Sequence, residues 1–237
     1  FFGAEVKAKD LDLDAVPDLL VYRVHPTLVV ASLEWLSLRD GLSKALFTGR
    51  PLVTQGGWKL PADGPSTLAE LVRAAGYRTG LFSGNENVSK TFGMDRGFDF
   101  DAPGLKDPPE PGAPPVGFND NAARVYRAAR SWLLQLPKDQ PAFLYLHTIH
   151  QHNPYDPPPD LRARFTAGIS SLIEGSTEVV RGIDRGRVHP KAADRERLRR
   201  LYAAGLAYND RELETFLADA TVGYGPGEVA VVVTADH

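Results

Sequence analysis

Residues 66–83, STLAELVRAAGYRTGLFS, place a helical pattern directly before a strand pattern. Thr67 and Glu70 have the spacing of a capping box, which marks the start of a helix. Four apolar residues follow at the spacing of one helical stripe: Leu68, Leu71, Val72 and Ala75. Gly76 is a helix stop, and 77–83 is a strand after a tight connection. This helix-to-strand unit predicts an α/β fold with a largely parallel sheet.

The rest of the chain repeats this alternation. Residues 19–38 are expected to hold a strand followed by a helix, and 42–50 a short helix stopped by Gly49. The proline-rich stretch 102–117 is predicted to be a surface loop, because so many prolines cannot donate to a helix or a sheet. Residues 119–136 are predicted to be an amphipathic helix. Its expected core face is Ala123, Tyr126, Ala129, Trp132 and Leu133.

The second half of the chain supplies two further strands and a long helix. Residues 141–150, PAFLYLHTIH, form the continuous apolar run of a strand buried on both faces. A proline-rich loop, QHNPYDPPPDLRARF, is expected at 151–165. A helix over about 191–220 is predicted from helical spacing, and the last strand over 229–234. The inward residues of this helix are expected to be Leu198, Leu201, Tyr202, Leu206, Leu213 and Phe216.

Composition excludes several classes of function. The chain has 237 residues, a net charge of -3 and no cysteine, so disulfides, thiolate metal sites and a cysteine nucleophile are absent from it. It has no Lys/Arg block of the kind that binds nucleic acid. No apolar run approaches the roughly 20 residues of a membrane helix. The first residue is Phe1, and both ends resemble cuts through a longer chain. The sequence therefore predicts no cellular compartment.

Candidate chemistry gathers after two of the predicted strands. One strand is followed by His147, His150 and His152, and the other by Asp236 and His237. Ligands of open α/β sheets bind outside the carboxyl ends of the strands. An acid with an imidazole suits a divalent ion such as Zn or Mn. The alternative for each group is structural: a helix-capping Asp236 with a surface histidine, and loop histidines that bind no metal.

Five segments, in order, resemble the sulfatase family of the alkaline phosphatase superfamily. The resemblance begins near Leu46 and rests on these stretches: STLAELVRAAGYRTGLFSGN, FGMDRGFDFD, PAFLYLHTIHQHNPYDPPPDLRARF, LYAAGLAYNDRELETFL and VAVVVTADH. Each motif is weak alone, but five in the family's order and spacing are specific. The resemblance implies a three-layer α/β/α sandwich of the alkaline phosphatase/sulfatase type, with a mostly parallel central sheet, incomplete at both ends. We expect residues 1–237 to be part of one such catalytic domain.

The resemblance also implies roles for individual residues. Asp236 and His237 match a pair of metal ligands, which share their ion with two acids near the family's N-terminus. His152 matches the histidine that contacts the sulfate group and helps the leaving oxygen. The implied cofactor is a divalent metal ion (Ca, Mg, Mn or Zn), and the implied partner is a small-molecule or glycan sulfate or phosphate ester. The implied reaction is sulfate-ester hydrolysis, although related members cleave phosphate esters.

The chain departs from the family at the nucleophile. The C/S-x-P-S-R motif falls on RDGLSKALFTG, which places Arg39 at the nucleophile, Gly41 at the proline and Ser43 at the arginine. The lysine of a second family motif falls near Gly84, and the N-terminal acids are expected before Phe1. Arginine stays protonated at neutral pH and cannot attack an ester. Three hypotheses follow: a sulfate-ester hydrolase, a phosphoester or phosphonate hydrolase, and an inactive binding or structural protein.

Overall fold

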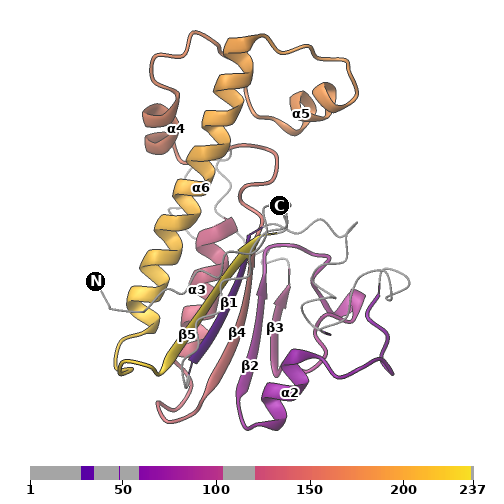
Figure 1. Cartoon of the computed structure of the whole chain (residues 1–237), viewed down its shortest axis with the longest axis vertical. Helices are drawn as coiled ribbons and strands as arrows, with labels where there is room; N and C mark the ends of the chain where they lie inside the picture. The colour runs from indigo at the N-terminus through magenta and orange to yellow at the C-terminus, as the bar shows by residue number, and fades with distance from the viewer. Residues whose placement is uncertain (1–27, 35–47, 49–58, 104–120, 236–237) are drawn as a thin grey trace, which may run out of the picture.

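The computed structural model describes residues 28–34, 48, 59–103 and 121–235. Its centre is a five-stranded sheet in the order β3-β2-β4-β1-β5, in which every pair of neighbouring strands is parallel. The strands are β1 (Leu28–Glu34), β2 (Arg78–Ser83), β3 (Phe100–Pro103), β4 (Ala142–Thr148) and β5 (Val229–Ala235). The predicted parallel α/β sheet is therefore confirmed, and β4 and β1 occupy its interior (Figure 1).

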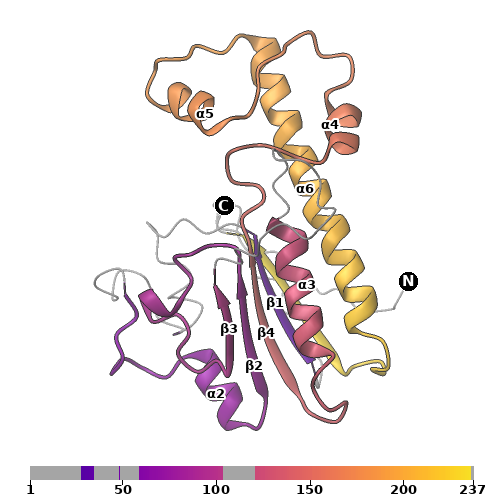
Figure 2. The same cartoon turned by 180° about the vertical axis from the view of Figure 1, so that it is seen from behind.

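Helices cover both faces of this sheet. The helices are α2 (Leu68–Ala74), α3 (Asn121–Leu133), α4 (Pro159–Thr166), α5 (Thr177–Asp184) and α6 (Ala192–Ala220), with a short 3₁₀ helix at Lys90–Phe92. Helices α3 and α6 lie side by side on one face, as Figures 1 and 2 show from opposite sides. Helix α2 packs on the other face, through Ala69. The three-layer α/β/α architecture is thus the one the sequence predicts.

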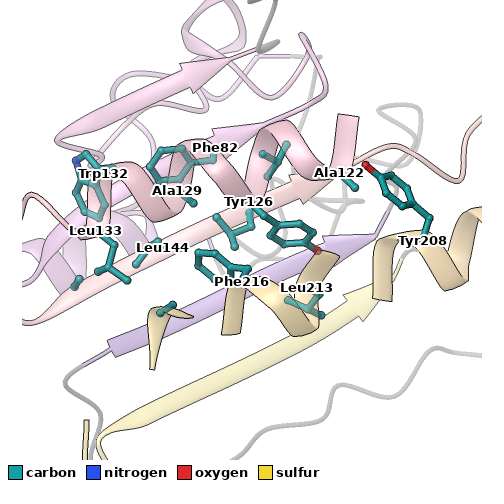
Figure 3. Close-up of a cluster of buried hydrophobic side chains, with 14 of the residues drawn as sticks. Phe82, Ala122, Tyr126, Ala129, Trp132, Leu133, Leu144, Tyr208, Leu213 and Phe216 are labelled. Atoms are coloured by element: carbon teal, nitrogen blue, oxygen red, sulfur yellow. The ribbon is translucent and has the colours of Figure 1, made fainter. Parts of the chain in front are cut away.

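The larger hydrophobic core lies between the sheet and the α3–α6 pair (Figure 3). Leu144 of β4 and Phe82 of β2 contribute to it from the sheet, because alternate residues of a strand face opposite sides. Tyr126 of α3 stacks on Phe216 of α6 with ring centroids 5.6 Å apart. The opposite face holds a smaller core of Ala69, Leu81, Val88, Met94, Phe143 and Tyr145. Every residue of β4 is buried, as its continuous apolar run predicts.

Helix α2 confirms one prediction and corrects another. The capping box is present: the Thr67 hydroxyl accepts from the Glu70 backbone N–H, and the Glu70 carboxylate accepts from the Thr67 N–H. The predicted apolar stripe is wrong, because Leu68 and Leu71 are 42% and 58% exposed. Ala69 faces the sheet instead, with Val72 partly buried beside it. A small residue at this position allows close packing of helix and sheet.

The segment after β4 contains helices where the sequence predicted a loop. Helix α4 begins at Pro159, which is tolerated there because the first helical N–H needs no partner. Helix α5 was not predicted. Helix α4 packs beside α6, and α5 lies at the same end of the molecule (Figure 1). With 29 residues, α6 is about 43 Å long, whereas seven-residue strands span about 23 Å, so half of the helix extends past the sheet.

The remaining predictions have mixed outcomes. In α3, Tyr126, Ala129, Trp132 and Leu133 are buried as expected, while Ala123 is only partly buried. In α6, Leu201, Leu213 and Phe216 are buried, and Leu198, Tyr202 and Leu206 are half-buried. The loop predicted over 102–117 begins too early, because Ala102 and Pro103 end β3. The rest of that loop and most of the helix predicted over 42–50 lie outside the described residues. Within the described part, no helix combines the length and apolarity needed to span a membrane.

Candidate functional site

The carboxyl ends of β2, β4, β1 and β5 meet at one edge of the sheet. The register places Glu34, the last residue of β1, beside both Thr148 of β4 and Ala235 of β5. His147 of β4 lies beside Ser83, the last residue of β2. Ala235 directly precedes Asp236 in the sequence. The strand ends that carry or precede the candidate residues therefore lie at one edge of the sheet, as parallel strands require.

His147 is fully buried at this edge. Neither of its ring nitrogens has a hydrogen-bond partner among the described residues, and its ring lies edge-on to Tyr145, with centroids 6.5 Å apart. Burial lowers the pKa of His147 to about 4, because the imidazolium would lose its hydration. The ring is therefore neutral at physiological pH, with one N–H donor and one lone pair available for a ligand.

The histidines at 147, 150 and 152 do not converge on one point. His150 packs against α6, where its ring meets Tyr208 edge-on with centroids 4.5 Å apart and lies over Gly205. Among the described residues, no three His, Asp or Glu side chains are grouped as metal ligands. The hypothesis that the three histidines form a metal site by themselves is not supported, since His150 has a packing role.

His152 lies half-buried in the loop that follows β4. Its Nδ1 is 2.7 Å from the carbonyl oxygen of Asn153. A carbonyl oxygen only accepts, so this contact is a hydrogen bond when Nδ1 carries the proton. The neutral ring then has its lone pair on Nε2. The role that the resemblance implies for this residue stays a prediction.

The near end of the His152 loop is held by Asn121, the first residue of α3. The Asn121 Oδ1 accepts a hydrogen bond from the Ile149 N–H at 3.0 Å. Its Nδ2 donates to the carbonyl of Gly84, just after β2, at 3.3 Å. The Ile149 carbonyl in turn accepts from the His152 N–H at 3.0 Å. One amide side chain thus joins the ends of β2 and β4, a role that the sequence alone did not reveal.

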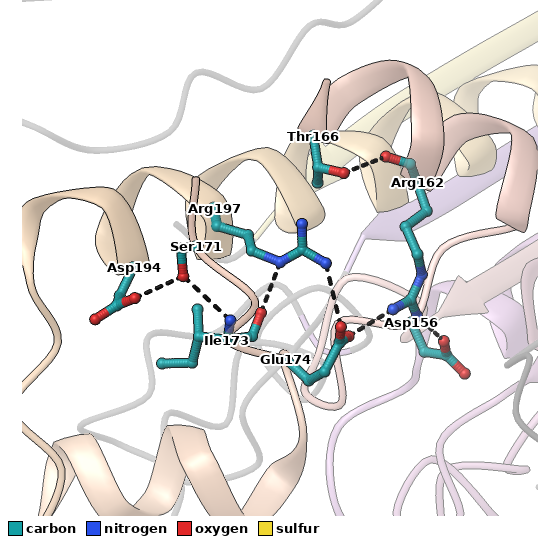
Figure 4. Close-up of polar contacts among 8 residues, drawn as sticks. All are labelled: Asp156, Arg162, Thr166, Ser171, Ile173, Glu174, Asp194 and Arg197. Carbon is teal, nitrogen blue, oxygen red and sulfur yellow. Dashed lines mark hydrogen bonds and ion pairs between the residues drawn. The ribbon is translucent and has the colours of Figure 1, made fainter. Parts of the chain in front are cut away.

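The far end of the loop is held by a polar network on the α4–α6 side (Figure 4). Tyr155 forms an antiparallel bridge with Gly175. Arg162 pairs with Asp156 and with Glu174, and Glu174 also receives a hydrogen bond from Arg197 of α6 at 3.1 Å. Burial raises the pKa of Asp156, and Arg162 opposes that effect. The loop is therefore fastened on both sides of His152.

Several buried polar atoms at this edge have no hydrogen-bond partner among the described residues. They are both ring nitrogens of His147, Oγ1 of Thr148, both amide atoms of Gln151 and Oδ1 of Asn153. Native proteins pair most buried polar groups with protein, water or ligand. We therefore expect polar groups outside the described residues to form hydrogen bonds with these atoms.

The divalent-metal site expected at this edge rests on residues named from the sequence. Asp236 and His237 lie outside the described residues, so their geometry stays a prediction. The strand that leads to them ends beside β1, whose last residue is Glu34. Carboxylate and imidazole donors suit ions such as Zn or Mn. Glu34, at the end of LVVASLE, is an acid that was not among the candidate residues and whose backbone the register places at this edge.

Comparison with known proteins identifies the family. The family model described as Sulfatase matches residues 43–237. The chain belongs to the sulfatase family. No curated protein sequence matches this sulfatase-family chain.

Solved structures show the same fold at low identity. BT4656, solved in complex with its substrate D-glucosamine-2-N,6-O-disulfate, matches with a TM-score of 0.59 and 12% identity, over 89% of this chain and 65% of that chain. The C-terminal periplasmic domain of EptC from Escherichia coli, in complex with Zn, matches with a TM-score of 0.54 and 13% identity, over 94% and 67%. Ps i-CgsB, in complex with κ-ι-κ-neocarrahexaose, gives 0.52 and 16%, over 89% and 58%.

These likenesses establish the alkaline phosphatase/sulfatase fold for this chain. The chain spans 60% of a protein in the alkaline phosphatase superfamily from Vibrio parahaemolyticus, and 65% and 58% of the two sugar complexes. At such identities and coverage, the reaction and substrate of this chain are matters for proposal.

Proposed function

We propose that this sulfatase-family chain hydrolyses sulfate esters at a divalent-metal site on the carboxyl edge of its sheet, with a sulfated glycan or small ester as substrate. The observation that carries the proposal is the gathering of β4, β1 and β5 at one edge, in register. The strand before the His152 loop and the strand leading to Asp236 and His237 lie on either side of β1 and end at this edge. Two of the similar structures, BT4656 and Ps i-CgsB, hold sugar ligands, which supports a glycan substrate.

His152 is the proposed proton donor. When an ester S–O bond breaks, the leaving alcohol oxygen gains negative charge and needs a proton. The contact of Nδ1 with the Asn153 carbonyl orients the ring; in the imidazolium form, Nε2–H gives its proton to the leaving oxygen and the ring returns to the neutral form with its proton on Nδ1. A positioned acid of this kind contributes roughly 10²–10⁴-fold to rate. The neutral, buried His147 is a candidate for binding sulfate oxygens through its N–H.

Asp236, His237 and Glu34 are the proposed holders of the metal ion. A bound divalent ion polarises ester oxygens and offsets their negative charge. The Zn complex of Escherichia coli EptC supports a metal on this fold, and Zn is therefore the first ion to test.

A second candidate function is an inactive binding protein, and Arg39 favours it. Arg39 occupies the family's nucleophile position, and its guanidinium cannot attack sulfur. Gly41 and Ser43 depart from the same motif. A chain with the His152 loop and the Asp236–His237 pair, but no nucleophile, would bind a sulfated ligand without cleaving it. The same scaffold also permits phosphoester or phosphonate hydrolysis.

Turnover by the full-length protein separates these functions. We expect aryl sulfate to be hydrolysed faster than aryl phosphate, and a chelator to abolish the activity. Faster phosphate cleavage would favour the phosphoesterase alternative. Metal-dependent binding of a sulfated sugar without turnover would favour the binding protein. The absence of both binding and turnover would exclude all three functions.

The metal assignment is tested in the same preparation by elemental analysis. We expect Asp236→Ala to lose most of the bound metal, because one charged ligand is removed. Asp210→Ala, at an exposed carboxylate on α6, is the matched control and is expected to keep the metal. Equal metal content in the two variants would contradict the assignment of Asp236.

A further inference from the structure

Asn121 lies where the carboxyl ends of two strands meet the start of a helix. Its side chain makes one hydrogen bond to each strand end: Oδ1 accepts from the Ile149 N–H at 3.0 Å, and Nδ2 donates to the Gly84 carbonyl at 3.3 Å. Only a side-chain amide supplies an acceptor and a donor in this fork. Neither an aspartate nor a leucine of similar size could make both bonds.

The bond to Ile149 leads directly to His152. The Ile149 N–H donates to Asn121, and the Ile149 carbonyl accepts a hydrogen bond from the His152 N–H at 3.0 Å. A single residue therefore separates the Asn121 amide from the His152 backbone. We therefore expect a movement of Asn121 to displace the turn that contains His152.

Gly84 is the counterpart that makes room for Asn121. A Cβ at residue 84 would lie 2.1 Å from Nδ2 and 2.3 Å from Oδ1 of Asn121, closer than any real contact. Gly84 also donates its N–H to the His147 carbonyl at 2.8 Å. The absence of a side chain at 84 thus allows the amide to sit between the ends of β2 and β4. This also gives a reason for glycine at the position where the family has a lysine.

We propose that Asn121 is a positioning residue that sets the orientation of His152 by fixing the Ile149–His152 turn against the end of β2. The proposal rests on the proposed function for the role of His152 in chemistry. Its structural part, the control of the turn by Asn121, stands on the hydrogen bonds alone. Asn121 touches no reacting group in this scheme and acts through Ile149.

Amide hydrogen exchange measures the structural part without any activity. In Asn121→Ala, the exchange rates of the Ile149 and His152 amides are expected to rise roughly tenfold, the factor that corresponds to one lost hydrogen bond of about 1.4 kcal/mol. Gly84→Ala leaves Asn121 in the chain but expels its side chain, so it should give the same increase. Asn121→Asp keeps the acceptor and should retain the protection of Ile149. Gln135→Ala removes another side-chain amide, two residues after α3, that donates to the Ser131 carbonyl, and is the matched control.

Unchanged exchange at Ile149 and His152 in folded Asn121→Ala and Gly84→Ala would overturn the proposal. Kinetics supply the second readout. If the wild type hydrolyses aryl sulfate, Asn121→Ala should lower kcat at least tenfold with KM changed less than about threefold, and Asn121→Asp should restore part of kcat. An unchanged kcat with raised exchange would also overturn it. If the wild type shows no turnover, the proposed function fails, while the exchange experiment still decides the role of Asn121 in the turn.

Discussion

At the scale of single residues, the fully buried His147 makes stability depend on pH. Burial lowers its pKa from 6.5 to about 4, so the unfolded chain binds a proton at higher pH than the folded chain. The stabilisation is complete above about pH 6.5 and is lost as the pH falls toward 4. Between pH 7 and about pH 4.5, this one group is expected to remove about 2 to 3 kcal/mol from the free energy of unfolding.

Denaturant unfolding at these two pH values, with a chelator present, measures the effect. His147→Gln carries no titrating ring and should lose about 2 to 3 kcal/mol less than the wild type over this pH interval. His189→Gln, at an exposed histidine after α5, should behave as the wild type. Parallel pH curves for wild type and His147→Gln would show that His147 is not buried in neutral form.

The candidate site was only partly predictable at this scale. His152 could be proposed because it lies in a sequence motif. His150, at nearly the same spacing, packs against Tyr208 instead, and no local pattern distinguishes the two. Asn121 carries no motif: its two hydrogen bonds arise from which strand ends the sheet brings together, and that is a property of strand order rather than of local sequence.

At the scale of elements, the α2 capping box is tied to the rest of the chain. The Thr67 hydroxyl accepts from the Glu70 N–H at 3.1 Å and donates to the Arg96 carbonyl at 2.9 Å. Burial raises the pKa of Glu70, but hydrogen bonds from Thr67 and Arg96 outweigh it and hold that pKa below its usual value. Glu70 of the cap therefore also binds Arg96, 26 residues later in the chain, and this contact joins the turn around Arg96 to the start of α2.

Removing the hydroxyl of Thr67 is expected to cost about 2 kcal/mol of stability. Thr67→Val keeps the shape but loses the helix cap, worth about 1 kcal/mol, and leaves the Arg96 carbonyl without its donor. Thr67→Ser keeps both hydrogen bonds and should lose clearly less. Urea unfolding of the two variants is the measurement, and an equal loss in both would mean that the methyl group stabilises this position as much as the hydroxyl does.

The elements also show where sequence periodicity stops being informative. The spacing of Leu68, Leu71 and Val72 is helical, and the helix is there, but Ala69 faces the sheet. Both faces of α2 carry apolar residues, so the pattern fixes the type of element and leaves its rotation open. In 151–165 the prolines suggested a loop, yet Pro159 begins α4, because proline disrupts a helix interior and not its first turn.

At the scale of the whole molecule, the sheet and its helices were predictable, because alternating helical and strand patterns lead to few alternatives. The part beyond the sheet was not. Segment 156–184 has few large buried side chains, and polar contacts hold it: Arg162–Asp156 and Arg162–Glu174 lie within the segment, and Arg197–Glu174 and Ser171–Asp194 join it to the start of α6. Such contacts form only after the fold has brought the residues together, so no periodicity of the sequence predicts them.

This difference predicts that the segment opens separately from the sheet. In Arg162→Met, the charge that joins Asp156 to Glu174 is lost, so amide exchange in 156–176 should rise about fivefold, as expected for about 1 kcal/mol. Exchange in β4 should stay at the wild-type rate, because the core residues beneath it are untouched. Arg164→Met, at an exposed arginine of the same helix that stacks over Phe165, is the matched control. A rise of equal size in β4 would mean that the segment and the sheet unfold as one unit, and that the polar contacts stabilise the whole molecule.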